Sequence, residues 1–248
     1  MQLKKNKLGA GRNIRFVSVM GKDVPFTYVE AFKSLRTNLN FLTNTSGVRS
    51  VLITSAVPEE SKSTTAINLA LTLASSGHSV VLVESDLRKP VLRKYLKREM
   101  GPAGLSSFLS GLVGLEDCIT DLKDLGISVI PAGVIPPNPS ELLHSSRMQE
   151  LITLLKQNYD YVLLDAPPVT VVTDAAVVGP MTDGALLVVR SRFASARTIR
   201  QAKTKLEAVG IRILGGVLTR FDMRKSGWRS GYDYKHYEYG YSHGRSKR

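Results

Sequence analysis

Six short apolar segments, separated by helical or turn-rich stretches, run along most of the chain. They consist mainly of Val, Ile and Leu and lack a polar residue at every second position. Strands with this composition are typical of a parallel sheet that helices cover on both faces. The pattern therefore predicts an α/β fold with a doubly wound, mostly parallel sheet. The predicted strands begin at Ser50, Ser79, Ile127, Tyr161, Gly184 and Ile213.

Helical spacing occurs before the first strand and again in the second half of the chain. Between residues 25 and 42, apolar side chains recur every three or four positions, which predicts an amphipathic helix ahead of the sheet. Further on, Asn138 is placed as a helix cap, Pro139 as the first helical residue and Glu141 as the partner of the cap. These signals predict a helix that begins at Pro139.

The sequence divides into one compact domain and two basic ends. Residues 1–22 are expected to form an irregular N-terminal arm, and residues 23–220 carry the predicted strands and helices. Residues 221–248 are rich in Gly, Ser and Tyr, which predicts a disordered or only conditionally ordered tail. Of the formal charge of +13, residues 220–248 contribute +5, from eight Lys or Arg against three Asp or Glu. A solvated, flexible end explains this charge most simply.

Composition bears on location and partners. No apolar run approaches the roughly 18 residues of a membrane-spanning helix, and the N-terminus lacks an apolar signal core. Cys118 is the one cysteine, which suits a reducing compartment, so a cytoplasmic protein is expected. The positive charge would attract nucleic acid, anionic lipid or phosphorylated ligands. Nucleic acid is the least favoured of these, because the chain has no recognisable recognition helix.

A phosphate-binding loop is predicted at Lys62. The stretch SAVPEESKSTTAINLA follows a predicted strand and leads into a predicted helix. In that setting backbone N–H groups surround a phosphate, the lysine adds charge and the Ser63 hydroxyl binds magnesium. A glycine usually precedes the lysine, but here Ser61 does, and a side chain at positive φ costs roughly 1–2 kcal/mol. Glu59 and Glu60 add negative charge near an anionic ligand, so affinity is expected to suffer.

Charged residues at the ends of two later strands complete the predicted site. Glu84, Asp86 and Arg88 follow one strand in VVLVESDLRKP, and Asp165 ends another in YVLLDAPP. A nucleotide site needs such carboxylates to hold magnesium or its waters and to take a proton from a nucleophile. A single acid after a strand is usually a cap or turn residue, but three acids at two strand ends favour a nucleotide site. For the loop taken alone, a serine-rich helix cap without a ligand is the alternative.

These motifs resemble those of the bacterial protein-tyrosine kinases of the polysaccharide co-polymerase system, over nearly the whole chain. SKSTTAINLA is similar to the Walker A ending, VVLVESDLRKP to the second acidic motif and YDYVLLDAPPV to Walker B. PPNPSELL matches a further family segment, and EAFKSLRTN resembles the E-x-x-R-x-x-R helix used in ring assembly. The resemblance implies a P-loop NTPase core and an ATP-dependent protein-tyrosine kinase.

The resemblance also implies roles for individual residues, with ATP or ADP and Mg²⁺ as ligands. Lys62 would neutralise the β- and γ-phosphates, and Ser63 would bind magnesium. Asp86 and Asp165 would complete the outer sphere of the metal, and either Glu84 or Asp86 would orient or deprotonate the acceptor tyrosine. The implied nucleotide-binding residues are Glu60, Ser61, Lys62, Ser63, Thr64, Arg88 and Thr219.

Partners follow from the resemblance as well. It implies a ring-like homo-oligomer with contacts from Glu30, Lys33 and Arg36, although Lys33 stands where the pattern has an arginine. It implies protein tyrosine substrates and a role in capsule or exopolysaccharide polymerisation and export. It further implies a membrane adaptor of the co-polymerase type, which would recruit the cytoplasmic kinase to the inner face of the membrane.

Tyrosines gather near the C-terminus. Five of the nine lie within ten residues of a basic segment, where no core could use them. Family members phosphorylate such a cluster between subunits, so the resemblance implies phosphoacceptors here. The alternative is an aromatic tail that binds RNA or polysaccharide. The five residues are Tyr232, Tyr234, Tyr237, Tyr239 and Tyr241.

Departures from the family pattern cluster at the nucleotide site. Glu59 and Ser61 replace glycines, Glu84 stands where aspartate is usual, and Thr219 stands where an asparagine commonly reads adenine. Together they predict weak or altered ATP use, and they leave open a catalytically degenerate scaffold of the same family. A cytoskeletal-type ATPase of the MinD and ParA type is a further alternative, but SAVPEE lacks the second lysine of that loop.

Overall fold

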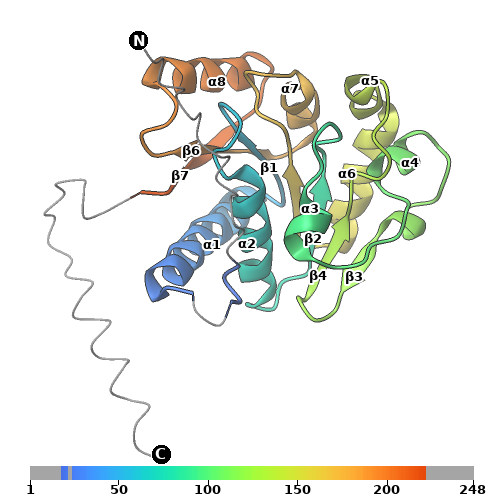
Figure 1. Ribbon diagram of the computed structural model, residues 1–248, viewed down its shortest axis with the longest axis horizontal. Coiled ribbons are helices and arrows are strands. Elements are labelled where there is room, and N and C mark those ends of the chain that lie inside the picture. Colours follow the sequence, from blue (N-terminus) through green and yellow to red (C-terminus); the bar gives the residue numbers. More distant parts are fainter. Residues whose placement is uncertain (1–17, 22–23, 222–248) are drawn as a thin grey trace, which may run out of the picture.

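A seven-stranded sheet forms the centre of the molecule (Figure 1). The computed structural model describes residues 18–21 and 24–221. The strand order is β3-β4-β2-β5-β1-β6-β7, and all neighbouring strands are parallel except β3 and β4. This arrangement confirms the predicted fold class. The strands are β1 (Ser50–Ser55), β2 (Val80–Glu84), β3 (Thr120–Leu122), β4 (Ile127–Ile130), β5 (Tyr161–Asp165), β6 (Gly184–Arg190) and β7 (Ile213–Thr219).

Helices cover both faces of the sheet, as a parallel sheet requires. The predicted helix ahead of the sheet is present and packs along the helix that follows the phosphate loop (Figure 1). The α-helices are α1 (Phe26–Ser46), α2 (Lys62–Ala74), α3 (Leu92–Leu96), α4 (Leu105–Leu109), α5 (Pro139–Leu143), α6 (Ser146–Asn158), α7 (Asp174–Val178) and α8 (Ala196–Ala208), with 3-10 turns at Glu116–Cys118 and Gly179–Met181.

Two apolar layers form the core, one on each face of the sheet. Successive strand side chains point to opposite faces, so Leu52 packs in one layer while Val51 and Ile53 pack in the other. Helices α1, α2 and α3 contribute to the layer of Val51, and helices α4 to α8 contribute to the layer of Leu52. Because both layers exclude water, all residues of β1, β2 and β5 are buried. The carboxyl ends of these strands therefore form a rigid edge.

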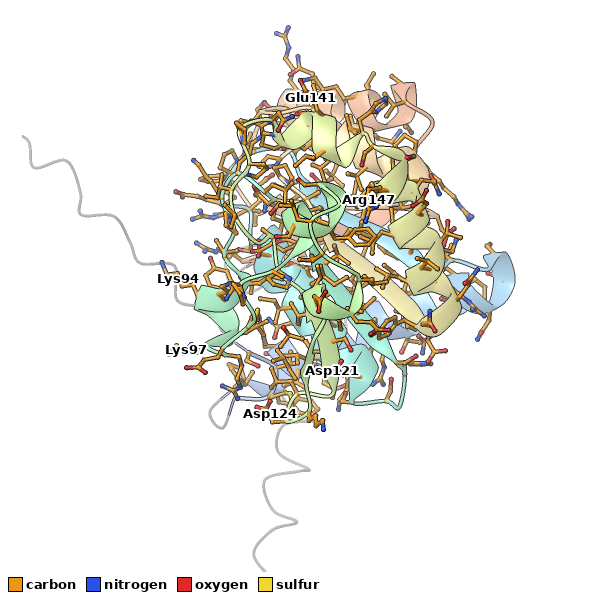
Figure 2. The ribbon with its side chains drawn as sticks, turned by 90° about the vertical axis from the view of Figure 1, so that its right-hand side faces the viewer. Lys94, Lys97, Asp121, Asp124, Glu141 and Arg147 are labelled. Atoms are coloured by element: carbon orange, nitrogen blue, oxygen red, sulfur yellow. The ribbon has the colours of Figure 1, made fainter. Side chains whose placement is uncertain are left out.

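One strand was missing from the sequence prediction. Strand β3 is only three residues long, contains Asp121, and pairs antiparallel with β4 at the edge of the sheet. Asp121 accepts a hydrogen bond from the Ser128 hydroxyl at 2.6 Å, and Asp124 pairs with Arg98 just beyond the strand (Figure 2). A strand this short and polar has no hydrophobic pattern from which it could be predicted. Pairing with β4 stabilises it.

The predicted helix start at Pro139 is confirmed, but its cap differs from the prediction. The Asn138 side chain makes no capping bond to the backbone and instead donates to the Glu141 carboxylate at 2.6 Å. The helix also stops at Leu143, and α6 begins anew at Ser146. This break turns the chain so that Leu143 and Met148 both reach the core.

The two predicted basic ends lie largely outside the described residues. The residues that the structure does not describe are 1–17, 22, 23 and 222–248, and the last range includes the five tyrosines of the tail. The described Val19 donates its N–H to the Asn68 side chain of α2 at 2.7 Å and packs against the core layer of that helix. No helix in the described part of the chain is long and apolar enough to cross a membrane.

Tyr161 fastens α1 to the sheet and provides a test of this packing. Its buried hydroxyl donates to Asn40 at 2.6 Å and accepts from Thr43 at 3.0 Å. Tyr161→Phe leaves both partners without this bond, so we expect the free energy of unfolding to fall by about 1 kcal/mol in urea titrations. Tyr159→Phe is the control, since that hydroxyl makes no hydrogen bond with described residues; an equal loss in both variants would contradict the assignment.

Candidate active site

The phosphate loop joins β1 to α2 at the carboxyl edge of the sheet. Helix α2 begins at Lys62, and the Ser61 carbonyl accepts the Thr65 N–H at 2.9 Å. Glu59 and Ser61 have φ values of 66° and 72°, in the left-handed region that favours glycine. The loop thus keeps the backbone of a glycine-containing loop although neither residue is glycine. Each such residue costs roughly 1–2 kcal/mol.

Three of the predicted site residues surround the ammonium of a fourth, Lys62. Its Nζ lies 2.9 Å from Asp86 Oδ2, 3.5 Å from Asp165 Oδ1 and 3.4 Å from Ser63 Oγ. The side chains of Lys62, Asp86 and Asp165 are 14%, 7% and 0% exposed. Burial by itself would lower the pKa of Lys62, but the charges of Asp165 and Asp86 outweigh it and raise that pKa. The lysine is therefore held charged where an anion would arrive.

Asp165 is the most constrained member of this group. Burial raises its pKa above the usual range, while Lys62 and the Ser63 hydroxyl oppose the rise. Within the described part of the chain, its buried Oδ2 has no hydrogen-bond partner. The backbone around it is fixed, because its carbonyl accepts the N–H groups of Ser85 at 2.9 Å and Asp86 at 3.1 Å. A buried, unpartnered carboxylate oxygen is suited to a cation or an ordered water.

The oxygen set of Ser63, Asp86 and Asp165 fits Mg²⁺, which prefers hard oxygen ligands. Among residues 18–21 and 24–221, no three His, Cys, Asp or Glu side chains lie close enough to hold a metal by themselves. This is the usual situation for Mg²⁺ that is bound through one or two carboxylates together with substrate phosphates and water.

Glu84 is placed differently from the other carboxylates. It lies beside Asp165 in the register of β2 and β5, yet its oxygens accept backbone N–H groups from Val91, Leu92 and Ala132. Burial raises its pKa, and these backbone bonds oppose the rise. Glu84 thus fastens the start of α3 and the loop after β4. Of the two acids in the motif VVLVESDLRKP, Asp86 is the one beside Lys62.

Arg88 makes its hydrogen bonds outside the Lys62 group. Its Nε and Nη2 donate to the buried Asp174 at 2.8 Å and 3.1 Å, and Nη2 also donates to Ser140 at 2.8 Å. The hydroxyl of Ser140 in turn donates to Asp174 at 2.6 Å. The loop after β2 is joined in this way to helices α5 and α7. The sequence prediction missed Asp174 and Ser140, and an acid within the apolar stretch VVTDAAVV was the available signal.

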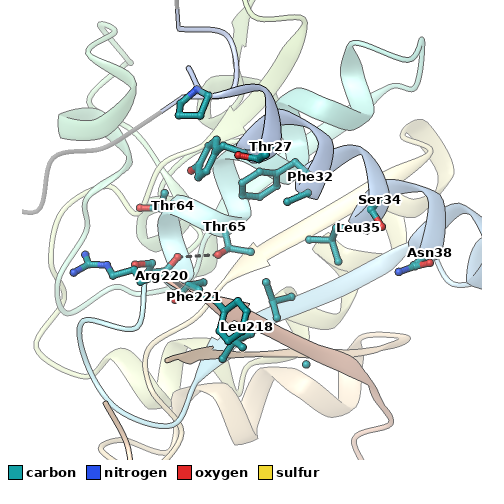
Figure 3. Close-up of a pocket in the computed structure, with 17 residues that line it drawn as sticks. Thr27, Phe32, Ser34, Leu35, Asn38, Thr64, Thr65, Leu218, Arg220 and Phe221 are labelled. Atoms are coloured by element: carbon teal, nitrogen blue, oxygen red, sulfur yellow. Dashed lines mark hydrogen bonds between the residues drawn. The ribbon is translucent and has the colours of Figure 1, made fainter. Parts of the chain in front are cut away.

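Thr219 at the end of β7 is also engaged within the chain. Its hydroxyl donates to the Glu60 carbonyl of the phosphate loop at 2.9 Å. Beside it lies a cavity of about 720 Å³ between α1, the start of α2 and the end of β7. In Figure 3, Phe32 and Leu35 of α1 face Leu218 and Phe221 across this cavity, and Thr64 closes it toward the phosphate loop. The cavity is within the size range of small-molecule sites.

The residues predicted for subunit contacts lie on α1. Lys33 pairs with Glu30 on the helix surface at 2.7 Å. Arg36 reaches across to α2, where its Nη1 donates to the Thr72 carbonyl at 3.2 Å. The predicted phosphoacceptors Tyr232 to Tyr241 lie outside the described residues.

Comparison with known proteins gives the family. A family model for an AAA domain matches residues 60–210. The tyrosine-protein kinase YwqD of Bacillus subtilis is 36% identical over 212 residues, which cover 86% of this chain and 85% of that protein. The chain belongs to the bacterial tyrosine-protein kinases. The family resemblance seen in the motifs is thereby confirmed.

Solved structures agree with this assignment. The kinase domain of the Escherichia coli tyrosine kinase ETK is 32% identical, with a TM-score of 0.77 over 92% of this chain and 90% of that one. The septum site-determining protein MinD of Pyrococcus horikoshii, complexed with Mg-ADP, is 25% identical, with a TM-score of 0.60 over 68% of this kinase and 69% of that chain. The latter likeness confirms the P-loop NTPase core.

Asp165→Asn tests the cost of the buried carboxylate in the kinase. Because the folded-state pKa of Asp165 is raised, the folded protein binds more protons than the unfolded chain, and stability falls as pH rises above about 3.9. At pH 7 we expect the variant to gain about 1 kcal/mol, and this gain should shrink as pH falls toward 4. Urea titrations from pH 4 to 8 measure it.

The exposed Glu116→Gln is the control for the change in net charge. If Asp165→Asn were less stable than the native kinase at pH 7, the prediction would be wrong and the Asp165 carboxylate would stabilise the folded protein.

Ser61→Gly tests the strain of the phosphate loop. Glycine removes the cost of the left-handed conformation, which is roughly 1–2 kcal/mol. It also makes the unfolded chain more flexible, which lowers the free energy of unfolding by about 0.4–1 kcal/mol. We therefore expect the free energy of unfolding to rise by about 0.5–1 kcal/mol in total. Thermal unfolding measures it. Ser75→Gly is the matched control and should destabilise, because Ser75 has a φ of −62°. Equal losses in both variants would refute strain at Ser61.

Proposed function

We propose that this kinase uses ATP to phosphorylate its own C-terminal tyrosines, with one copy acting on the tail of its neighbour. The observation that carries the proposal is the Lys62 ammonium, held within 2.9 Å of Asp86 and 3.5 Å of Asp165 at the start of α2. An NTPase loop followed by two strand-end carboxylates is the arrangement that phosphoryl transfer needs. Membership of the tyrosine kinase family supports the acceptor.

The chain's own groups would act in sequence. Lys62 would exchange its carboxylate partners for the β- and γ-phosphates, which frees Asp86 Oδ2. The phenolic oxygen of the acceptor tyrosine then bonds to the γ-phosphorus as the bond from phosphorus to the β–γ bridging oxygen breaks, and ADP leaves. Asp86 takes the phenolic proton, while Glu84 holds the backbone on which Asp86 is placed. Phosphoryl transfer depends mostly on such positioning and charge neutralisation.

The bound ligands would be ATP, then ADP, with Mg²⁺. Ser63, Asp86 and Asp165 would hold the ion directly or through water, and the ion would neutralise charge on the phosphates. Thr64, on the first turn of α2, would lie near the α-phosphate. The cavity between α1 and β7 adjoins the loop at Ser61 and Thr64, which favours it as the place of the nucleoside.

A weakened activity is part of the proposal. Glu59 and Ser61 both hold a left-handed backbone at a cost that glycine would avoid. Thr219 is bonded to the loop, which limits its contact with a base. The second candidate, favoured by the same two strained residues, is a catalytically degenerate member that assembles without transferring phosphate.

Partners and location follow the family. The proposed kinase works in a ring of identical subunits, with Glu30, Lys33 and Arg36 of α1 near the contacts. It is cytoplasmic and recruited to the inner face of the membrane by an adaptor of the polysaccharide co-polymerase type. Its role there is to regulate capsule or exopolysaccharide polymerisation and export, with tail phosphorylation of Tyr232, Tyr234, Tyr237, Tyr239 and Tyr241 as the switch.

Mass spectrometry of the purified protein tests this proposal. After incubation with Mg²⁺ and ATP, we expect phosphate on residues 232–241, and Lys62→Met should reduce it by roughly 100-fold or more. The matched control is Lys94→Met, because Lys94 is an exposed lysine of α3 that points to solvent (Figure 2). No phosphate in the native protein, even with the cytoplasmic segment of the adaptor, would favour the degenerate scaffold.

A further inference from the structure

Glu60 is a buried carboxylate at the centre of the phosphate loop. It is 0% exposed, although its neighbour Glu59 is exposed. The residues on both sides of it, Glu59 and Ser61, have left-handed φ values. The sequence alone suggested that Glu60 binds the nucleotide, but its side chain points into the protein.

Three hydrogen bonds converge on Glu60. Its Oε2 accepts the Val57 N–H of the same loop at 2.9 Å, and its Oε1 accepts the Arg190 N–H at the end of β6 at 3.2 Å. Its carbonyl accepts the Thr219 hydroxyl at the end of β7 at 2.9 Å. One residue therefore joins the loop to the last residues of two strands.

These bonds oppose the strain on either side of Glu60. Two left-handed residues other than glycine, one on each side of Glu60, make the loop conformation unfavourable on its own. Hydrogen bonds from N–H groups to an ionised carboxylate are stronger than neutral ones, and inside the protein they are not weakened by water. A carboxylate in this loop would also repel phosphates, so a role as a nucleotide ligand is the less favourable use of its charge.

We infer that Glu60 is a positioning residue that holds the strained phosphate loop in its binding shape. It acts through the backbone of Val57, Arg190 and its own carbonyl, without contact with the nucleotide. The inference rests on the proposed function only where nucleotide affinity is measured, since the shape of the loop is a property of the free protein.

Glu60→Gln and Glu59→Gln form the decisive pair. Each removes one negative charge from the same loop, but only Glu60→Gln replaces an oxygen that accepts a backbone N–H by an amide that donates. If the two carboxylates only repelled the phosphates of ATP, both variants would bind ATP more tightly. Positioning predicts weaker binding in Glu60→Gln and unchanged or tighter binding in Glu59→Gln.

Two measurements read out the pair. Hydrogen exchange of the free protein should rise about tenfold in residues 56–61 and at Arg190 for Glu60→Gln, with no change for Glu59→Gln. Calorimetric titration with Mg²⁺ and ATP should show affinity about fivefold to tenfold lower for Glu60→Gln. In the phosphorylation assay the KM for ATP should rise more than kcat falls. Adding Ser61→Gly to Glu60→Gln should recover part of the lost affinity, because it removes strain.

Equal exchange and equal or tighter ATP binding in Glu60→Gln and Glu59→Gln would overturn the inference. If Glu60→Gln does not fold, Thr219→Val replaces it, because this change removes only the bond to the Glu60 carbonyl; unchanged exchange in residues 56–61 would then count against the inference. If the native kinase binds no ATP, the proposed function fails, while the exchange comparison still decides the role of Glu60.

Discussion

The site depends on one buried positive charge, the ammonium of Lys62, which lies between two carboxylates. Burial by itself would disfavour the charged form of a lysine that is 14% exposed, and the nearby carboxylates of Asp86 and Asp165 hold it charged. Strand β5 supplies Asp165, the turn after β2 supplies Asp86, and the helix after β1 supplies the lysine. Parallel strands bring these three segments to one edge, so the charge pairing depends on the sheet topology.

The neighbouring carboxylates support this group without joining it. Glu84 accepts backbone N–H groups from the start of α3 and from the loop after β4, and Asp174 holds Arg88 and Ser140. Buried carboxylates are costly unless they are hydrogen-bonded, and both of these are. These hydrogen bonds join the end of β2 and the loop after it to α3, α5 and α7 and to the loop after β4, at the same edge of the sheet as Lys62.

The phosphate loop departs from an unstrained backbone at two positions within three residues. Glu59 and Ser61 hold conformations that glycine adopts freely, and Glu60 between them is bonded to the ends of β6 and β7. The residue types at these positions do not favour the backbone conformation that they adopt, and the hydrogen bonds of Glu60 to β6 and β7 offset the cost. Such disagreement is expected at functional sites, where the geometry needed by a ligand outweighs local preference.

The sequence by itself determined the sheet and the residues that gather at its edge. Apolar segments without polar alternation require burial on both faces, and the carboxyl ends of such strands meet at one edge, which places Lys62 with Asp86 and Asp165. Strand β3 and the break between α5 and α6 left no such pattern, because pairing and packing decide them. Only the tertiary structure decided what each polar residue does at that edge: Glu84, Glu60 and Thr219 turn toward backbone groups distant in sequence, and Arg88 turns to Asp174. The reason is that a side chain's hydrogen-bond partner depends on which loops lie next to it in space, and that proximity is absent from the local pattern.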